Sequence, residues 1–187
     1  MMAALLYLGA GLGIGLVSLF RREDRSQARP LSRQDLPFVV GMIVLDIAAP
    51  ILLMMGIRAG SSSSASLLGN FEIAATAVIA LFVFHEGVSK RLWAAIGLIT
   101  LSSALLSFQG ADSLRFSPGS LLVLLAAACW GFENNCTRMI SSKSTYEIVV
   151  LKGVFSGTGS LAIALARGEA LPTPPAAAAA LLLGFVA

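Results

Sequence analysis

Apolar residues are gathered along this chain into long runs separated by short polar connections. A helix needs roughly 20 predominantly apolar residues to cross the hydrocarbon core of a bilayer. Runs of about that length lie at 2–20, 38–57, 65–84, 92–108, 119–137 and 147–166, and another begins near Pro175. Backbone amides in hydrocarbon must be hydrogen-bonded within their own segment, and barrel strands would be shorter and alternating. The pattern therefore predicts an all-α integral membrane protein, a multi-span helix bundle.

Composition supports the same fold class. Of the 187 residues, 57% are hydrophobic and 12% are charged, whereas soluble domains carry about 25% charged residues. The formal net charge is only +3, and the basic residues stand mostly between apolar runs. We therefore expect the lipid bilayer as a partner, and we expect no nucleic acid.

Basic residues are distributed unequally between alternate connections, which predicts an orientation. The second, fourth and sixth connections carry one each, namely Arg58, Arg115 and Arg167. The first, third and fifth carry all the others except Lys152, which lies just inside a run: Arg21, Arg22, Arg25, Arg29, Arg33, Lys90, Arg91, Arg138 and Lys143. The positive-inside rule then places connections 21–37, 85–91 and 138–146 in the cytoplasm. We expect a multi-pass protein of the plasma membrane (the bacterial inner membrane).

Both ends of the sequence suggest an incomplete chain. The orientation starts the N-terminus outside, although no signal peptide precedes the first run, and a missing preceding span would explain this. The last run, from Pro175 to Ala187, is too short for a comfortable span. We therefore expect a fragment or a truncated form of a longer protein.

An internal repeat relates the first and sixth runs. At a constant offset of 146, residues 5, 11, 13, 19, 21 and 23 are identical to 151, 157, 159, 165, 167 and 169. The two runs are five spans apart, so they cross the membrane in opposite directions. Inverted repeats of this kind build many secondary transporters, which bind their substrate at the repeat interface. The alternative is a pair of unrelated helices with similar packing glycines.

Two acids within apolar runs are candidates for a substrate path. A carboxylate at the centre of a membrane helix costs roughly 2.5–3.5 kcal/mol, so it usually faces a cavity or a partner. Asp46 lies near the middle of its run, one turn before Pro50, which suits a gate or a proton site. Glu72 shares a small or polar helix face with Ala65, Gly69 and Thr76. For each acid the alternative is a structural hydrogen bond to a neighbouring helix.

A polar stripe in the fifth run is a third candidate. Trp130, Glu133, Asn134 and Thr137 fall at i, i+3, i+4 and i+7 on one helix face. An indole with amide and carboxylate neighbours could hold an amphipathic or cationic solute. Alternatively, Trp130 is a packing residue, and Glu133 and Asn134 reach water at the helix end.

The remaining residue types indicate packing and not catalysis. Small residues let membrane helices approach closely, and we assign this role to Gly9, Gly11, Gly13, Gly153, Gly157 and Gly159. Cys129 and Cys136 are about 10 Å apart on a helix, too far for a disulfide. His85 is the only histidine, so a histidine cluster cannot form. We expect no enzyme, no metal and no cofactor.

The ordered set of segments resembles the EamA type of drug/metabolite transporter. Residues 67–108, with Glu72, Glu86 and Gly97, resemble the end of one EamA repeat. Residues 119–138, with Ala128, Trp130, Gly131, Thr137 and Arg138, resemble the start of the next, and residues 6–19 resemble the second helix of the family. Ile73 stands where a proline is common, and Ala104 where a glycine is common.

The resemblance implies ten helices in two inverted repeats of five. Residues 1–110 would then be helices two to five of the first repeat, and 117–187 the truncated start of the second. The implied function is export of small metabolites or drugs by alternating access, with a small-molecule solute as partner. The alternative is a truncated, non-transporting membrane protein or assembly partner. Pairing of two copies to complete a pathway stays open.

Overall fold

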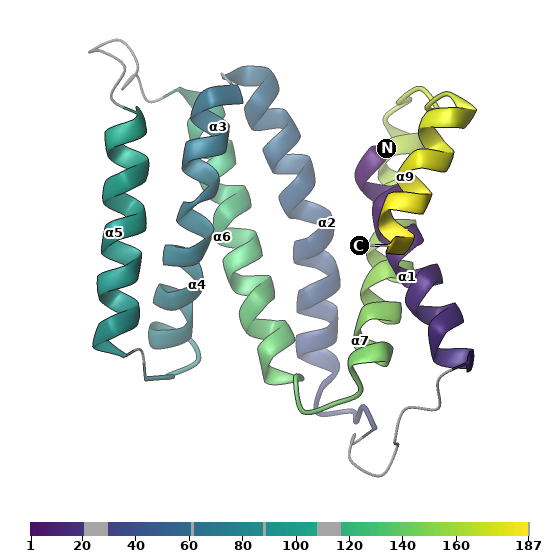
Figure 1. Ribbon diagram of the computed structural model, residues 1–187, viewed down its shortest axis with the longest axis horizontal. Helices are drawn as coiled ribbons and strands as arrows, with labels where there is room; N and C mark the ends of the chain where they lie inside the picture. Colours follow the sequence, from purple (N-terminus) through teal and green to yellow (C-terminus); the bar gives the residue numbers. More distant parts are fainter. Residues whose placement is uncertain (21–29, 61, 88, 108–116, 187) are drawn as a thin grey trace. The chain divides into compact units, whose positions relative to one another are not determined.

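The computed structural model describes residues 1–20, 30–60, 62–87, 89–107 and 117–186, and every regular element within them is a helix (Figure 1). The elements in chain order are α1 (Met2–Phe20), α2 (Leu36–Ala59), α3 (Ser62–Gly69), α4 (Phe71–Phe82), α5 (Lys90–Ser107), α6 (Pro118–Met139), α7 (Thr145–Leu151), the π-helix η2 (Lys152–Ser156), α8 (Gly157–Ala166) and α9 (Pro174–Val186).

The predicted all-α membrane fold is confirmed. Three helical stretches among the described residues are long and apolar enough to cross a membrane: Leu36–Ala59, Ala65–Phe82 and Thr145–Ala166. Two shorter apolar helices cover Met2–Ser18 and Pro174–Val186. Each apolar run of the sequence thus forms helix, because only helical hydrogen bonding satisfies the backbone of a single segment in hydrocarbon.

Local sequence signals set several helix ends. Ser144 precedes α7 with extended backbone, and its side chain accepts a hydrogen bond from the backbone N–H of Glu147; a serine followed three residues later by glutamate is a capping box. Gly168 follows α8 with φ 69°, and the next N–H, of Glu169, donates to Ala164 O. This left-handed glycine ends the helix in the way that a C-terminal cap requires.

Two irregularities could not be read from the apolar pattern. The third run is divided at Asn70, a turn residue between α3 and α4 whose N–H donates to Leu67 O. The sixth run changes from α- to π-helix at Lys152–Ser156 and back again at Gly157. A π-turn inserts an extra residue into a helix, and such turns occur frequently at functional sites.

The chain divides into two compact units, which we describe separately. Unit 1 comprises Met1–Ile47 and Cys136–Ala187, and unit 2 comprises Ala48–Asn135. Unit 1 therefore holds α1, the first half of α2, the last turn of α6, and α7, η2, α8 and α9.

In unit 1, α1 is antiparallel to the continuous stretch of α7, η2 and α8. Going along α1, Leu8 contacts Gly157, Gly11 contacts Gly153, and Gly15 lies near Val150. The partner residues run backwards, so the two stretches run in opposite directions. On another side of α1 lies α9, where Gly184 packs against the backbone of Leu6 (Figure 1).

The contacts of unit 1 occur in equivalent pairs. Adding 146 to a residue of α1 gives its counterpart in α7–α8, and adding 138 to a residue of α2 gives its counterpart in α9. The contact of Gly13 with Phe185 then corresponds to that of Gly159 with Ile47. Likewise, the contact of Leu6 with Gly184 corresponds to the ion pair of Lys152 with Asp46. Two contacts of α1 with α9 and two contacts of α7–α8 with α2 are thus related by the same pair of offsets.

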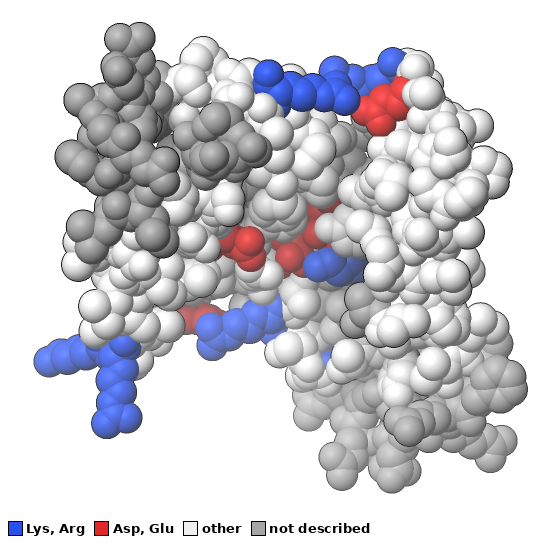
Figure 2. All heavy atoms as spheres, turned by 45° about the horizontal axis from the view of Figure 1, so that its top comes forward, with Lys and Arg blue, Asp and Glu red and all other residues white. Residues whose placement is uncertain are grey.

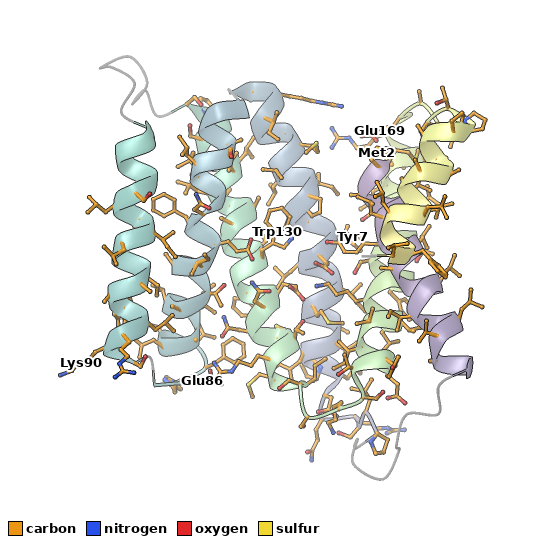
Figure 3. The ribbon with its side chains drawn as sticks, in the orientation of Figure 1. Met2, Tyr7, Glu86, Lys90, Trp130 and Glu169 are labelled. Atoms are coloured by element: carbon orange, nitrogen blue, oxygen red, sulfur yellow. The ribbon has the colours of Figure 1, made fainter. Side chains whose placement is uncertain are left out.

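Polar contacts tie the two ends of unit 1. At one end, Lys143 Nζ lies 2.9 Å from Asp35 Oδ2 and donates to Pro30 O. At the other, the amino group of Met1 lies 2.8 Å from Glu169 Oε2; Met2 and Glu169 lie close together in Figure 3. The connections that carry Asp35 and Lys143 are therefore at one end of this unit. The basic residues Arg21, Arg22, Arg25, Arg29 and Arg115 lie outside the described residues.

In unit 2, the second half of α2 packs closely on the start of α6, and α4 packs on its later part. A Cβ on Gly119 would lie 2.6 Å from Gly56 O, and one on Gly131 would lie 2.8 Å from Thr76 N. The rings of Phe84 and Phe132 meet edge to face with centroids 5.7 Å apart. Small residues on α2 and α6 thus allow backbone-to-backbone packing, as is usual between membrane helices.

Candidate functional site

Asp46 forms the centre of a charged cluster in unit 1. Its side chain is 1% exposed, and its Oδ2 lies 3.4 Å from Nζ of Lys152, which is 29% exposed. Tyr7 donates a hydrogen bond of 3.2 Å from its hydroxyl to Asp46 Oδ1. The three residues come from α2, η2 and α1, so helix packing assembles them from distant parts of the sequence.

The geometry of η2 places Lys152 toward Asp46. Gly153, the next residue, has no side chain and packs against α1, where a Cβ would lie 2.7 Å from Tyr7 O. Lys152 is thus next in sequence to the residue at which η2 packs closely on α1, and its side chain extends to Asp46 on α2. Tyr7 projects from α1 at this level (Figure 3).

The charges of Asp46 and Lys152 can be buried only because they compensate each other. Two isolated charges in hydrocarbon would each be costly, whereas removing one member of a buried pair costs about 3–5 kcal/mol because the other is left uncompensated. Ionisable groups inside membrane helices usually mark a path for a substrate or an ion. Asp46 and Lys152 both lie within apolar helical stretches.

Glu72 takes part in a second polar cluster, within unit 2. Asn134 on α6 donates from Nδ2 to Glu72 Oε1 at 2.9 Å and to Thr76 Oγ1 at 3.4 Å on α4. Thr76 in turn donates to the backbone oxygen of Glu72 at 2.8 Å. Because Asn134 is exposed and Glu72 is only half-buried, this cluster is accessible from outside the helix packing.

Asn135 links α4 and α6 next to that cluster. Its Nδ2 donates to Thr76 O at 2.9 Å and to Gly131 O at 2.8 Å, and its side chain is buried. One amide therefore bridges α4 and α6 where Gly131 brings their backbones together. This arrangement holds Glu72 and Asn134 opposite each other.

The polar stripe predicted on α6 is divided between two environments. Glu133 is 2% exposed, whereas its neighbour Asn134 is exposed. Trp130 and Thr137 are half-buried, and Trp130 projects from the middle of α6 (Figure 3). The interpretation that Glu133 reaches water at the helix end is therefore wrong, because packing encloses it. The indole of Trp130 and the amide of Asn134 keep part of their surface exposed.

The structure thus joins Glu72 to Asn134, and it gives Asp46 the partners Tyr7 and Lys152. These partners were missed, as was Asn135. Lys152 could have been recognised from the sequence, because a lysine within an apolar run is as costly to bury as an acid. Tyr7 carried no signal, since half-polar aromatic residues are common in membrane helices.

Figure 2 shows one face on which neutral atoms predominate and charged atoms form small groups. Among the residues that the structure describes, no three His, Cys, Asp or Glu side chains are grouped so that they could hold a metal ion.

Two comparisons relate this chain to known proteins. Residues 1–108 match the EamA-like transporter family. The chain is also similar to a protein named "Uncharacterized transporter" from Methanothermobacter thermautotrophicus, with 23% identity over 152 residues. That alignment covers 79% of this chain and 44% of the other protein, so the chain spans less than half the length of this relative.

Proposed function

Since this chain belongs to the EamA-like transporter family, we propose that it moves small metabolites or drugs across a membrane by alternating access, in the direction of export. The observation that carries the proposal is the ion pair of Asp46 and Lys152 inside apolar helices, in which Oδ2 and Nζ lie 3.4 Å apart. A charge pair inside apolar helices is costly to bury, and in membrane proteins such groups usually serve a path or a coupling ion.

The proposed architecture is two inverted repeats of five helices. Residues 1–110 supply helices two to five of the first repeat, and 117–187 supply the start of the second. Support comes from unit 1, where α1 and α7–α8 are antiparallel and have equivalent contacts. Alternating access in such proteins is largely a movement of one repeat against the other about a central site.

The residues of the proposed substrate path are Asp46, Glu72, Trp130, Glu133 and Asn134. Asp46 or Glu72 takes up and releases a proton during transport. The other proposed elements are packing by the six predicted glycines, a location in the bacterial inner membrane, and a homodimer where one copy cannot enclose the path alone.

A flux assay tests this function. The protein is expressed from its complete reading frame, and membrane vesicles are loaded with labelled metabolites and drugs under an imposed pH gradient. We expect efflux above that of control membranes, and a loss of its proton dependence when Asp46→Asn and Glu72→Gln are combined. The matched control Glu169→Gln, in the connection after α8, should behave as the wild type.

The outcomes separate the competing functions. Stable insertion with no flux of any solute would support a non-transporting membrane protein or assembly partner. Flux with unchanged proton dependence in the double variant would retain the transporter and reject Asp46 and Glu72 as its titrating groups.

A further inference from the structure

One of the two related helix pairs of unit 1 carries a row of polar residues that the other pair lacks at the corresponding positions. Lys152, Ser156 and Ser160 stand at intervals of four on η2 and α8, so they share one helix face. Their counterparts on α1, at an offset of 146, are all apolar: Leu6, Ala10 and Ile14. The pair formed by α2 and α7–α8 is therefore polar where the pair formed by α9 and α1 is not.

The facing helices differ in the same way. Asp46 on α2 corresponds to Gly184 on α9, and both are buried. Gly184 packs directly against the backbone of Leu6, whereas Asp46 faces the ammonium group of Lys152. The interface of α1 with α9 is thus closed by backbone contact, whereas the corresponding interface of η2 with α2 carries an ion pair. Helix packing alone does not need the charged version, because the apolar version performs it in the same unit.

Two residues of the stretch that carries these side chains contact α2. Lys152 reaches Asp46 at one end of this face, and Gly159 contacts Ile47 at the other. Ser156 lies between these contacts along the helix and is 0% exposed. The hydroxyl oxygens of Ser156 and Ser160 are buried and have no hydrogen-bond partner among the described residues. A buried hydroxyl without a partner costs free energy, so two on one face point to a polar occupant.

Exposure indicates the sign of that occupant. Lys152 retains 29% of its side-chain exposure, and Asp46 retains 1%. A solute that approaches this face therefore meets the ammonium group, and the carboxylate lies behind it. The ammonium and the two hydroxyls can all donate hydrogen bonds, which suits the oxygens of a carboxylate or a phosphate.

We propose that the face formed by Lys152, Ser156 and Ser160, opposite Asp46, binds an anionic carboxylate or phosphate group of the transported solute. The equivalent interface of α1 with α9 holds the unit together and binds no solute. This inference rests on the proposed transport function and deepens it by naming the chemical class of the substrate.

Asp46 competes with the solute in this site. Both the carboxylate of Asp46 and the anion attract the same ammonium group, so Asp46 weakens anion binding while it keeps Lys152 compensated in the empty state. Removing the charge of Asp46 should therefore strengthen anion binding, and removing that of Lys152 should abolish it. A purely structural ion pair predicts no such opposition between the two variants.

Thermal unfolding of the purified chain in detergent tests the site. The probes are sodium succinate and sodium phosphate, with choline chloride as the cationic probe, all at matched ionic strength. A ligand that binds only the folded state raises the midpoint with its concentration. We expect either anion to raise the midpoint of the wild type. The increase should be larger for Asp46→Asn than for the wild type, and Lys152→Gln should show no increase.

Two variants control the interpretation. Lys143→Gln removes a lysine from another ion pair of the same unit and should respond as the wild type. Should Lys152→Gln fail to fold, the combination of Asp46→Asn with Lys152→Gln leaves no uncompensated charge, and it too should give no response. An equal response of this double variant and the wild type would overturn the proposal. The proposal would also be overturned if choline stabilised the wild type but not Asp46→Asn. The same holds if neither anion changed the midpoint of Asp46→Asn.

The result is separable from that of the flux assay. Flux without an anion response would reject the anion site and leave the transporter. An anion response without flux from the complete reading frame would retain the site and reject transport.

Discussion

At the scale of single residues, glycines decide how closely the helices of unit 1 approach. A Cβ on Gly11 would lie 3.0 Å from Gly153 Cα, and one on Gly13 would lie 2.8 Å from Phe185 O. These neighbours are backbone atoms, which cannot rotate away as a side chain could. The distance between α1 and its partners is therefore fixed by the absence of side chains at these positions.

Replacing one of these glycines should cost stability even though alanine favours helix. Gly153→Ala would place a methyl group against the backbone of Gly11 and Tyr7, and overpacking of this kind costs about 1–3 kcal/mol. We expect a lower thermal midpoint in detergent.

Gly97 on α5 provides the matched control. A Cβ there would have no neighbour within 4 Å, so Gly97→Ala should gain up to about 1 kcal/mol of helix propensity. If Gly153→Ala proved as stable as Gly97→Ala, the close packing of α1 on η2 would be contradicted.

At the scale of elements, connections tie neighbouring helices through a few strong polar contacts. Asp35 stands directly before α2 and joins Lys143 of the connection before α7. The backbone N–H and the hydroxyl of Ser32 both donate to its Oδ2 at 2.7 Å. The hydrogen bond from Lys143, followed by those from Ser32, lowers the pKa of Asp35 from 3.8 to about 2.

This contact should make stability depend on acid pH. Because the pKa of Asp35 is lower in the folded state, the unfolded chain binds more protons between the two values, and stability rises with pH there. The contribution should be complete above the ordinary pKa of 3.8 and be lost as the pH falls toward about 2.

Comparison with Asp35→Asn isolates this effect from other carboxylates. The thermal midpoint of the wild type should exceed that of Asp35→Asn near neutral pH, and the difference should shrink between about pH 4 and pH 2. A difference that stays constant over this range would show that Lys143 does not hold Asp35 in its charged form.

At the scale of the whole molecule, the outward-facing side chains match a lipid environment. Large apolar residues are well exposed on helices of both units, among them Leu98 at 68% and Leu182 at 64%. Soluble proteins rarely expose large contiguous apolar patches. In a membrane these side chains would contact acyl chains, whereas buried polar residues such as Asp46 and Glu133 are enclosed by helix packing.

The proposed orientation can be tested by labelling single cysteines. In a background with Cys129→Ala and Cys136→Ala, Ser141→Cys should react with an impermeant maleimide only in inside-out vesicles. Ala170→Cys should react only in intact cells, because the connection after α8 lies on the opposite side.

Each contrary outcome of the labelling has its own meaning. The reverse labelling would invert the orientation. Labelling of both positions from one side would contradict the passage of α7–α8 across the membrane.

The sequence by itself determined where the helices are, and it suggested which family the chain belongs to. The length of an apolar run is a local property, and hydrocarbon leaves the backbone of such a run no conformation other than helix. For the same reason Asp46 and Glu72 could be recognised as unusual, since each stands inside an apolar run. The break at Asn70 and the π-turn at Lys152–Ser156 were not evident, because an apolar run does not show whether its helix is regular or interrupted.

Only the tertiary structure decided which polar groups meet. Tyr7, Asp46 and Lys152 are brought together by the packing of α1 and α2 on η2, and Asn134 reaches Glu72 because Gly131 lets α4 approach α6. These meetings depend on distances and rotations between helices, which the pattern of apolar residues along one helix does not contain. The contrast between the charged contact of Asp46 and the backbone contact of Gly184 emerged in the same way, once two distant helix pairs could be compared in space.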